Sequence, residues 1–290
     1  MKKTIPAIVV LIALISAFAA AVGIFSDAGP GKFEYESIRG HTVEIYGKGI
    51  YRHMSADVAI QGIAQDYITL CLAVPVLILS LLGYRRNNLR AHFLLTGTLG
   101  YFLVTYLFYT AMGMYNHMFL AYVALMGLSF FGFYISAKQL FRLKAAEIFS
   151  EKTPTRFAGW LLILNPVLIG LLWLSVIVPP LLDGTIYPDQ LEHYTTLIVQ
   201  GLDLGLLLPI CFVSGILLIR KKHAGYFYGT IYLLFLALLM TALTAKIVGM
   251  SLNDINVVPA IFIIPGINLI TLIAAVWMIR SLRNFPTQIS

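Results

Sequence analysis

Apolar side chains along this chain gather into eight long runs that are separated by polar connections. The runs cover residues 5–25, 67–84, 93–114, 118–137, 158–182, 196–219, 226–250 and 257–279. A helix rises about 1.5 Å per residue, so about 20 residues cross a hydrocarbon core of about 30 Å. Each run therefore predicts a transmembrane helix, and together they predict an all-α, polytopic membrane helical bundle of about eight helices.

The amino-acid composition agrees with this pattern and limits the classes of binding partner that we expect. Of the 290 residues, 59% are hydrophobic and 11% are charged, whereas soluble domains carry about 25% charged residues. A net charge of +7 would be compatible with nucleic-acid binding. The basic residues instead form small clusters at the ends of the apolar runs, as membrane orientation requires. We expect a lipid bilayer as partner, and no nucleic acid.

The distribution of Lys and Arg predicts the orientation. Fifteen of the 20 lie in connections on the same side as both termini, and four lie in the loop of residues 26–62. Lys246, inside the seventh run, is the last. Because basic residues are retained on the cytoplasmic side, both termini are predicted to be cytoplasmic. The expected location is a cell membrane, the bacterial plasma membrane.

The first run resembles a signal peptide, because Ala17-Phe18-Ala19 is typical of a cleavage site. Its apolar stretch continues to Phe25, which is longer than the usual core of such peptides and favours an uncleaved anchor. The predicted segments are the anchor (1–25), an extracytoplasmic loop (26–62), helices two to four (63–137), a cytoplasmic linker (138–157), helices five to eight (158–283) and a cytoplasmic tail (284–290).

The linker divides the helices into two groups of four with a faint internal likeness. Asp66 precedes Pro75 in the second run, and Asp203 precedes Pro209 in the sixth. The two spacings differ by three residues, which is close to one helical turn. A parallel repeat would explain this likeness, and so would the shared apolar alphabet of membrane helices.

The loop of residues 26–62 contains a predicted β-hairpin. Residues 41–46 and 50–53 alternate β-branched and aromatic positions around Gly47-Lys48-Gly49. A lone hairpin is marginally stable in water, so we expect it to rest on the bundle or the membrane surface. It is either a lid over a binding site or a connector without chemistry.

Ionisable residues near the outer ends of the runs form a candidate ligand-binding vestibule. Asp66, Asp203 and Lys246 each lie about 25–30 Å from the inner boundary along their helices. Such residues usually face the bundle interior or a water-filled cavity. The alternative is that both aspartates cap helix starts and Lys246 extends to the interface. His117 and His193 are predicted on the same outer side and complete the candidate set.

A second candidate ligand site lies near the midplane, where prolines interrupt two runs. Asn165 precedes Pro166, and Asn268 follows Pro265-Gly266. A proline removes a backbone hydrogen bond, and carbonyls freed at a broken helix can coordinate ions or a substrate. Proline kinks without any transport role are the alternative.

The known catalytic motifs do not indicate a function for this sequence. The sequence has no P-loop, no G-x-S-x-G and no H-E-x-x-H, and its two cysteines, Cys71 and Cys211, lie separately in apolar runs. We predict no metal site, no catalytic residue and no cofactor. Three classes remain in this order: a small-solute or ion transporter, a non-catalytic assembly factor or partner subunit of another membrane protein, and a membrane-embedded enzyme acting on a lipid or envelope precursor.

Overall fold

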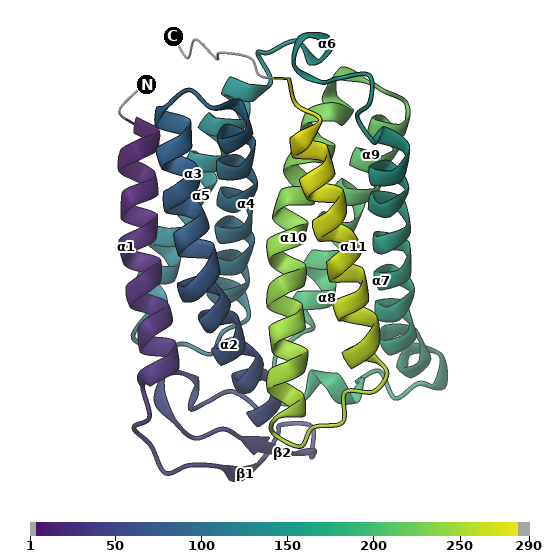
Figure 1. The fold of residues 1–290 in the computed structure, drawn as a ribbon. Coiled ribbons are helices and arrows are strands. Elements are labelled where there is room, and N and C mark those ends of the chain that lie inside the picture. The colour runs from purple at the N-terminus through teal and green to yellow at the C-terminus, as the bar shows by residue number, and fades with distance from the viewer. Residues whose placement is uncertain (1–3, 284–290) are drawn as a thin grey trace.

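The computed structural model describes residues 4–283, and the predicted tail of residues 284–290 lies outside them. Within the described residues, eight helices are long and apolar enough to cross a membrane (Figure 1). They are α1 (Thr4–Phe25), the interrupted helix α2–α3 (Ala56–Arg85), α4 (Leu89–Ala111), α5 (Phe119–Leu140), α7 (Thr155–Asp183), the interrupted helix α8–α9 (Ile198–Ile219), α10 (His223–Ser251) and α11 (Ala260–Arg280). The prediction of eight apolar helices is confirmed.

The second helix begins about two turns before residue 63, where its segment was predicted to start. The second helix begins at Ala56, so the outer loop ends at Ser55 and not at residue 62. The first turns of α2 carry polar residues such as Asp57 and Gln61, and an apolar run does not detect them. They form a helix because that helix packs against α1 and α10.

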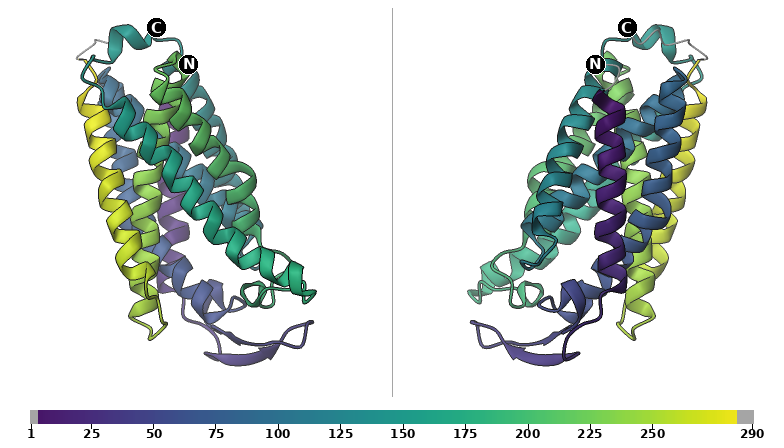
Figure 2. Two further views of the ribbon diagram at one scale, coloured as in Figure 1. Left: turned by 90° about the vertical axis from the view of Figure 1, so that its right-hand side faces the viewer. Right: turned by 90° about the vertical axis from the view of Figure 1, so that its left-hand side faces the viewer.

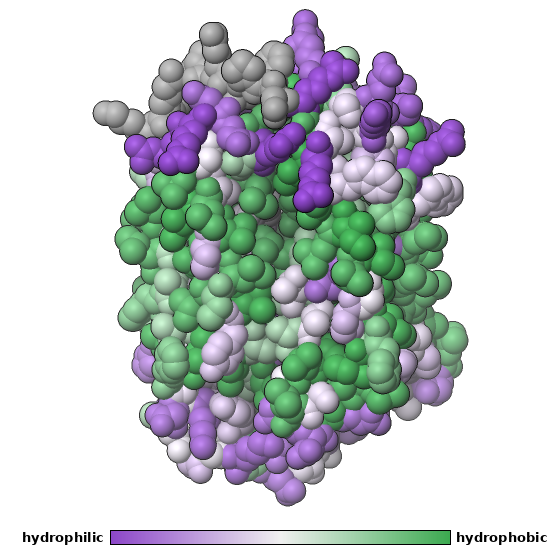
Figure 3. Space-filling view, in the orientation of Figure 1, coloured by the Kyte–Doolittle hydropathy of each residue, from purple (hydrophilic) through white to green (hydrophobic). Residues whose placement is uncertain are grey.

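The helices form one bundle with distinct ends. The described chain begins and ends at one end, here called the termini end, and the hairpin covers the opposite one, the hairpin end (Figures 1 and 2). In Figure 3 a band of apolar side chains separates the polar ends. An apolar band between two polar ends is typical of multi-pass membrane proteins. The short helix α6 (Ala145–Ile148) lies in the connection between α5 and α7 at the termini end.

The prediction of a small hairpin is confirmed, but its strands were misplaced. β1 (Phe33–Glu36) pairs antiparallel with β2 (Thr42–Ile45). Gly47 and Gly49 adopt φ angles of 74° and 58°, which glycine tolerates best, and they turn the chain inward. The expected second strand at residues 50–53 therefore starts as a 3-10 turn (Gly49–Tyr51) whose Ile50 and Tyr51 are buried.

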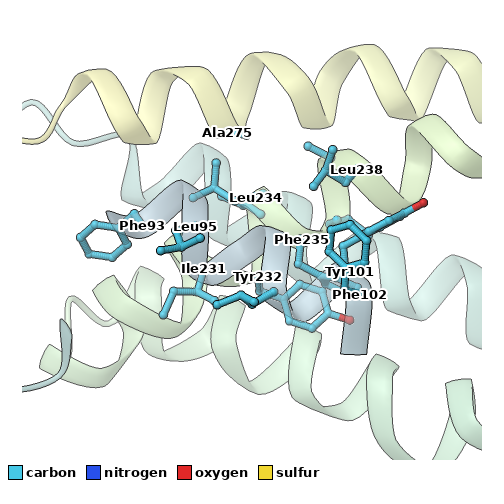
Figure 4. Packing of buried hydrophobic residues seen from close by; sticks show 14 of the residues in the cluster. Phe93, Leu95, Tyr101, Phe102, Ile231, Tyr232, Leu234, Phe235, Leu238 and Ala275 are labelled. Carbon is cyan, nitrogen blue, oxygen red and sulfur yellow. The ribbon is translucent and has the colours of Figure 1, made fainter. Parts of the chain in front are cut away.

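Helices α4 and α10 form the centre of the molecule, and α7 is the most exposed span. Figure 4 shows their aromatic and aliphatic side chains packed together. The rings of Phe93 and Phe227 stack with centroids 5.8 Å apart. Gly97 lets the two helices approach, because a Cβ there would lie 2.5 Å from the Leu234 Cβ. The tight contact joins the two groups of four helices.

Each half of the chain contains one span with a π-helical turn. Residues Thr69–Ala73 separate α2 (Ala56–Ile68) from α3 (Val74–Arg85). Residues Asp203–Leu207 separate α8 (Ile198–Leu202) from α9 (Leu208–Ile219). A proline follows each turn, and a proline cannot donate the regular hydrogen bond to the residue four positions earlier. The wide π turn is thus placed where regular helical bonding is already incomplete.

The two halves repeat further features at one constant spacing. Four pairs of residues, one member in each half, share a structural role. One pair starts the π turns, and a second supplies the prolines after them. A third adopts a left-handed φ angle between two helices, and a fourth donates a hydroxyl to the carbonyl four residues earlier. Each pair is 134 positions apart: Thr69 and Asp203, Pro75 and Pro209, Asn87 and Lys221, Thr96 and Thr230. The second and third spans therefore correspond to the sixth and seventh at this spacing, as a parallel structural repeat would predict.

This spacing corrects the alignment expected from sequence. Asp203 corresponds to Thr69, and Asp66 corresponds to Gln200. The two aspartates are not equivalent in the two halves, so each was placed in this region of the bundle independently.

Of the two alternatives given for the midplane prolines, the broken helix does not apply. α7 continues through Pro166, and α11 continues through Pro265. Neighbouring helices and local adjustments can satisfy the backbone groups that a proline frees. The interruptions occur instead in the second and sixth spans.

Candidate functional site

Asp66 is the most deeply enclosed acidic side chain of the candidate vestibule. It lies on α2 with 2% of its surface exposed. The Tyr51 hydroxyl donates to its Oδ2 atom at 2.5 Å. The Tyr109 hydroxyl of α4 lies 3.0 Å from Oδ1 and 3.2 Å from the Gly62 carbonyl oxygen, so its one proton can serve either acceptor. Asp66 is therefore held by side chains from two other elements and does not cap a helix start.

Tyr51 closes the site on the side of the hairpin end. Its ring is 5% exposed and packs in a small cluster with Ile50, Met54 and Ala59. Burial raises the pKa of Tyr51 well above its usual value, and the Asp66 charge adds to the effect. The phenol consequently keeps its proton and remains a donor to the carboxylate.

Gly23 of α1 makes room for this arrangement. A Cβ at Gly23 would overlap the Asp66 Oδ2 atom and would lie 3.3 Å from the Tyr51 hydroxyl oxygen. The absence of a side chain thus lets α1 pack directly against the hydrogen-bonded pair.

Lys246 of α10 is the third charged residue of this region. It is partly buried and interacts electrostatically with Asp203 and with Asp66. Within residues 4–283 neither carboxylate forms a direct ion pair with it. A lysine between two acids leaves one excess negative charge when all three are ionised. We call Asp66, Asp203 and Lys246 the charged trio.

Asp203 opens the π turn of the second half. Its Oδ2 atom accepts a hydrogen bond of 2.8 Å from the indole nitrogen of Trp173, which lies on α7. The predicted role as a cap does not apply here either, because α8 precedes Asp203 without a break in the helical chain. The trio therefore draws on α2, on α10 and on the junction of α8 with α9.

A layer of uncharged polar groups lies beside Asp66. Gln65 donates to the Tyr101 hydroxyl at 2.6 Å, and Thr69 lies 3.1 Å from the same oxygen. All three side chains are buried. Buried polar groups need partners, and these groups provide partners for one another. The layer connects the start of the first π turn with the centre of α4.

None of the other predicted site residues forms a hydrogen bond or an ion pair with the trio within residues 4–283. His117 is exposed between α4 and α5. His193 lies in the loop after α7, where a ring nitrogen is 3.0 Å from the His53 carbonyl oxygen. Asn268 contacts the hydroxyls of Thr241 and Thr244 on α10, both at 3.3 Å. Asn165 is buried, and its side-chain oxygen has no partner among the described residues.

A cleft of about 470 Å³ opens at the hairpin end beside the start of α2. Its acidic lining residues are Glu44, Asp57, Asp189 and Glu192, and Lys32 forms an ion pair of 3.0 Å with Glu44. Burial, with the nearby Asp57 carboxylate, raises the pKa of Glu192 to about 7. The cleft therefore has an excess of negative charge. Groups of three or more residues arranged to hold a metal ion are absent from residues 4–283.

Sequence reasoning missed Tyr51, Tyr109 and Trp173. Tyr51 was placed in a strand, and Tyr109 and Trp173 lie within apolar runs. Their hydroxyl and indole groups meet the carboxylates only after residues far apart in the chain come together. No local pattern around these residues indicates that contact.

Comparisons with known proteins leave the family open. No family model, no curated protein and no solved structure matches the chain.

Proposed function

We propose that this chain is a small-solute or ion transporter, and that the charged trio is the part of its site that handles a cation. The proposal rests on the two π-interrupted spans, which lie at corresponding positions 134 residues apart. Interrupted helices in corresponding halves are the feature of transporter folds that best indicates a binding site. Single π turns also occur frequently at functional sites.

The location of the trio supports this reading. Asp203 starts the second π turn, and Asp66 lies one turn before the first. Ionisable residues in membrane spans are costly and mark substrate, ion or proton pathways. With two carboxylates facing one ammonium, a proton or another small cation would neutralise the remaining charge. The acidic cleft at the hairpin end would raise the local concentration of cations at the entrance.

The two other function classes receive less support. An enzyme acting on a lipid precursor was expected to combine Asp66 and Asp203 with His117 and His193, and no hydrogen bond or ion pair joins these histidines to the trio within residues 4–283. A non-catalytic partner subunit would not require the charged trio, and it would tolerate loss of the Asp66 charge.

Flux measurements in proteoliposomes test the proposal. The purified full-length protein is reconstituted alone, and movement of H⁺, Na⁺ and K⁺ is followed with enclosed fluorescent indicators under an imposed membrane potential. We expect flux of at least one cation, and a loss of about tenfold or more in Asp66→Asn and Asp203→Asn. Asp27→Asn, at an exposed position of the outer loop, is the matched control and should retain the flux. Equal flux in all variants, or flux no greater than that of empty liposomes, would contradict the proposal.

A further inference from the structure

A second cavity lies at the termini end, far from the charged trio. It has a volume of about 500 Å³ and lies between the α6 segment, the turn from α9 to α10 and the end of α11. Its basic lining residues are Lys144, Lys221, His223 and Arg283, and Glu151 is its acidic one. With His223 neutral, the lining carries a net charge of +2. Polar side chains gather at this end in Figure 3.

Backbone hydrogen bonds hold the walls of this cavity together. The Ser150 amide donates to the Ser281 carbonyl at 3.2 Å, and the Arg283 amide donates to the Ile148 carbonyl at 2.8 Å. The end of α11 is thus joined to the α6 segment. Arg283 and Lys144 are brought to one cavity by this pairing, although they lie far apart in the sequence.

The turn between α9 and α10 supplies the third cation. Lys221 adopts a φ angle of 51°, and the repeat-equivalent residue is Asn87, with a φ angle of 57°. Asparagine is common in this left-handed region, and lysine is not. The second half therefore holds a lysine in the conformation that the first half gives to asparagine. In the same turn α10 begins at His223, and the Lys222 side chain does not cap it.

The wall of the cavity is apolar and aromatic on one side. Phe149 and Tyr226 line it, with ring centroids 4.9 Å apart. Aromatic rings at the ends of membrane spans lie at the level of lipid headgroups. Lys144 already pairs with Glu147 at 3.3 Å, but the side chains are 81% and 49% exposed, so this ion pair contributes little and can be exchanged.

We infer that this cavity binds the phosphate group of an anionic membrane lipid. Three cations from three separate segments converge on it, and the first amides of α10 lack intrahelical partners and favour an anion. Both α10 and α11 are long enough to span a membrane, and the cavity lies at their ends. Basic pockets between helix ends on the cytoplasmic side are recognised sites for lipid phosphates. The positive-inside pattern predicts that this end faces the cytoplasm.

Binding can be measured on the full-length protein in mild detergent by native mass spectrometry and by thermal unfolding. The probes are phosphatidylglycerol, phosphatidylcholine with the same acyl chains, and inorganic phosphate. The pocket variant is Lys144→Gln, Lys221→Gln and Arg283→Gln combined. Its control, Arg85→Gln, Arg86→Gln and Lys138→Gln combined, removes equal charge from the same end outside the cavity.

We expect phosphatidylglycerol to bind and to raise the unfolding temperature of the wild type and of the control. Each cation removed from the cavity should weaken that binding about fivefold, because a basic residue near an anionic lipid contributes about 1 kcal/mol. The single variants Lys144→Gln and Lys221→Gln, at exposed positions, keep the test valid if the triple variant does not fold.

Three outcomes would overturn the inference. They are equal binding of phosphatidylglycerol by the pocket variants and the control, equal binding of phosphatidylcholine and phosphatidylglycerol by the wild type, and cavity-dependent binding of inorganic phosphate without binding of phosphatidylglycerol. The last would assign the cavity to a free phosphate compound.

Discussion

Gly23→Ala perturbs the charged trio without altering any of its members. The added methyl group would overlap the Asp66 Oδ2 atom and would lie 2.8 Å from its Cγ atom. The carboxylate would have to move away from α1. This movement would break the hydrogen bond of 2.5 Å between the Tyr51 hydroxyl and the Asp66 carboxylate. It would also lengthen the hydrogen bond of 3.0 Å from the Tyr109 hydroxyl.

The magnitude follows from these two hydrogen bonds. A hydrogen bond to a charged group contributes about 1.5–3 kcal/mol, so losing one and weakening the other costs about 3 kcal/mol. Alanine is the better helix former, by about 0.5–1 kcal/mol. The net destabilisation should be about 2 kcal/mol, which corresponds to a drop of roughly 5 °C in unfolding temperature for a chain of this size.

The assay is size-exclusion chromatography of the detergent-solubilised protein after heating in steps. Gly127→Ala on α5 is the matched control, because no atom lies within 4 Å of a Cβ at that position. It should be as stable as the wild type or slightly more so. If Gly23→Ala matches Gly127→Ala in stability and retains cation flux, then α1 does not pack against the Asp66 carboxylate and the reasoning is refuted.

Three further predictions concern contacts around the site. Tyr51→Phe should destabilise the protein by about 1–3 kcal/mol, because a buried carboxylate loses a donor, while Tyr115→Phe, at a largely exposed ring, should be neutral in the same heating assay. Because the folded pKa of Glu192, about 7, exceeds its usual 4.5, the folded chain holds a proton that the unfolded chain has lost between those pH values. Stability should therefore fall by on the order of 1 kcal/mol, discounted for partial exposure, as pH rises through that window, whereas Glu192→Gln should lack this fall; parallel pH profiles would contradict it. Gly97→Ala should destabilise by about 1–3 kcal/mol because it overpacks the contact between α4 and α10, and a result equal to that of Gly201→Ala, which meets open space, would contradict that packing.

The eight helices were predictable because each contains an apolar run long enough to cross a bilayer. Their ends were less predictable wherever polar residues continue a helix, as at Ala56 of α2. One strand of the hairpin, Thr42–Ile45, was predictable from its β-branched residues, whereas the predicted turn at Gly47-Lys48-Gly49 lies outside the hairpin. Its pairing was not, because burial of Ile50 and Tyr51 competes with strand formation after Gly49.

The candidate site was predictable only in part. Asp66, Asp203 and Lys246 stand out because charges are rare in apolar runs. Their hydrogen-bond partners do not stand out, because tyrosine and tryptophan are ordinary packing residues of membrane helices. The π turns were also hidden, since each adds one residue to a turn without changing the residue types around it. The correspondence of the two spans emerges only once both turns are located, 134 positions apart.

The most direct test of the proposed pathway is the two-sided accessibility of a cysteine beside the trio. Thr69→Cys, in a protein with Cys71→Ser and Cys211→Ala, places a thiol at the repeat equivalent of Asp203, at a position that is 1% exposed in this structure. A charged, membrane-impermeant thiol reagent is applied to one side of proteoliposomes at a time, with Ser175→Cys on the exposed surface of α7 as the control. A transporter with its pathway at the trio predicts that Thr69→Cys reacts from both sides and Ser175→Cys from neither. No reaction of Thr69→Cys from either side, in a variant that retains cation flux, would contradict a pathway through the trio.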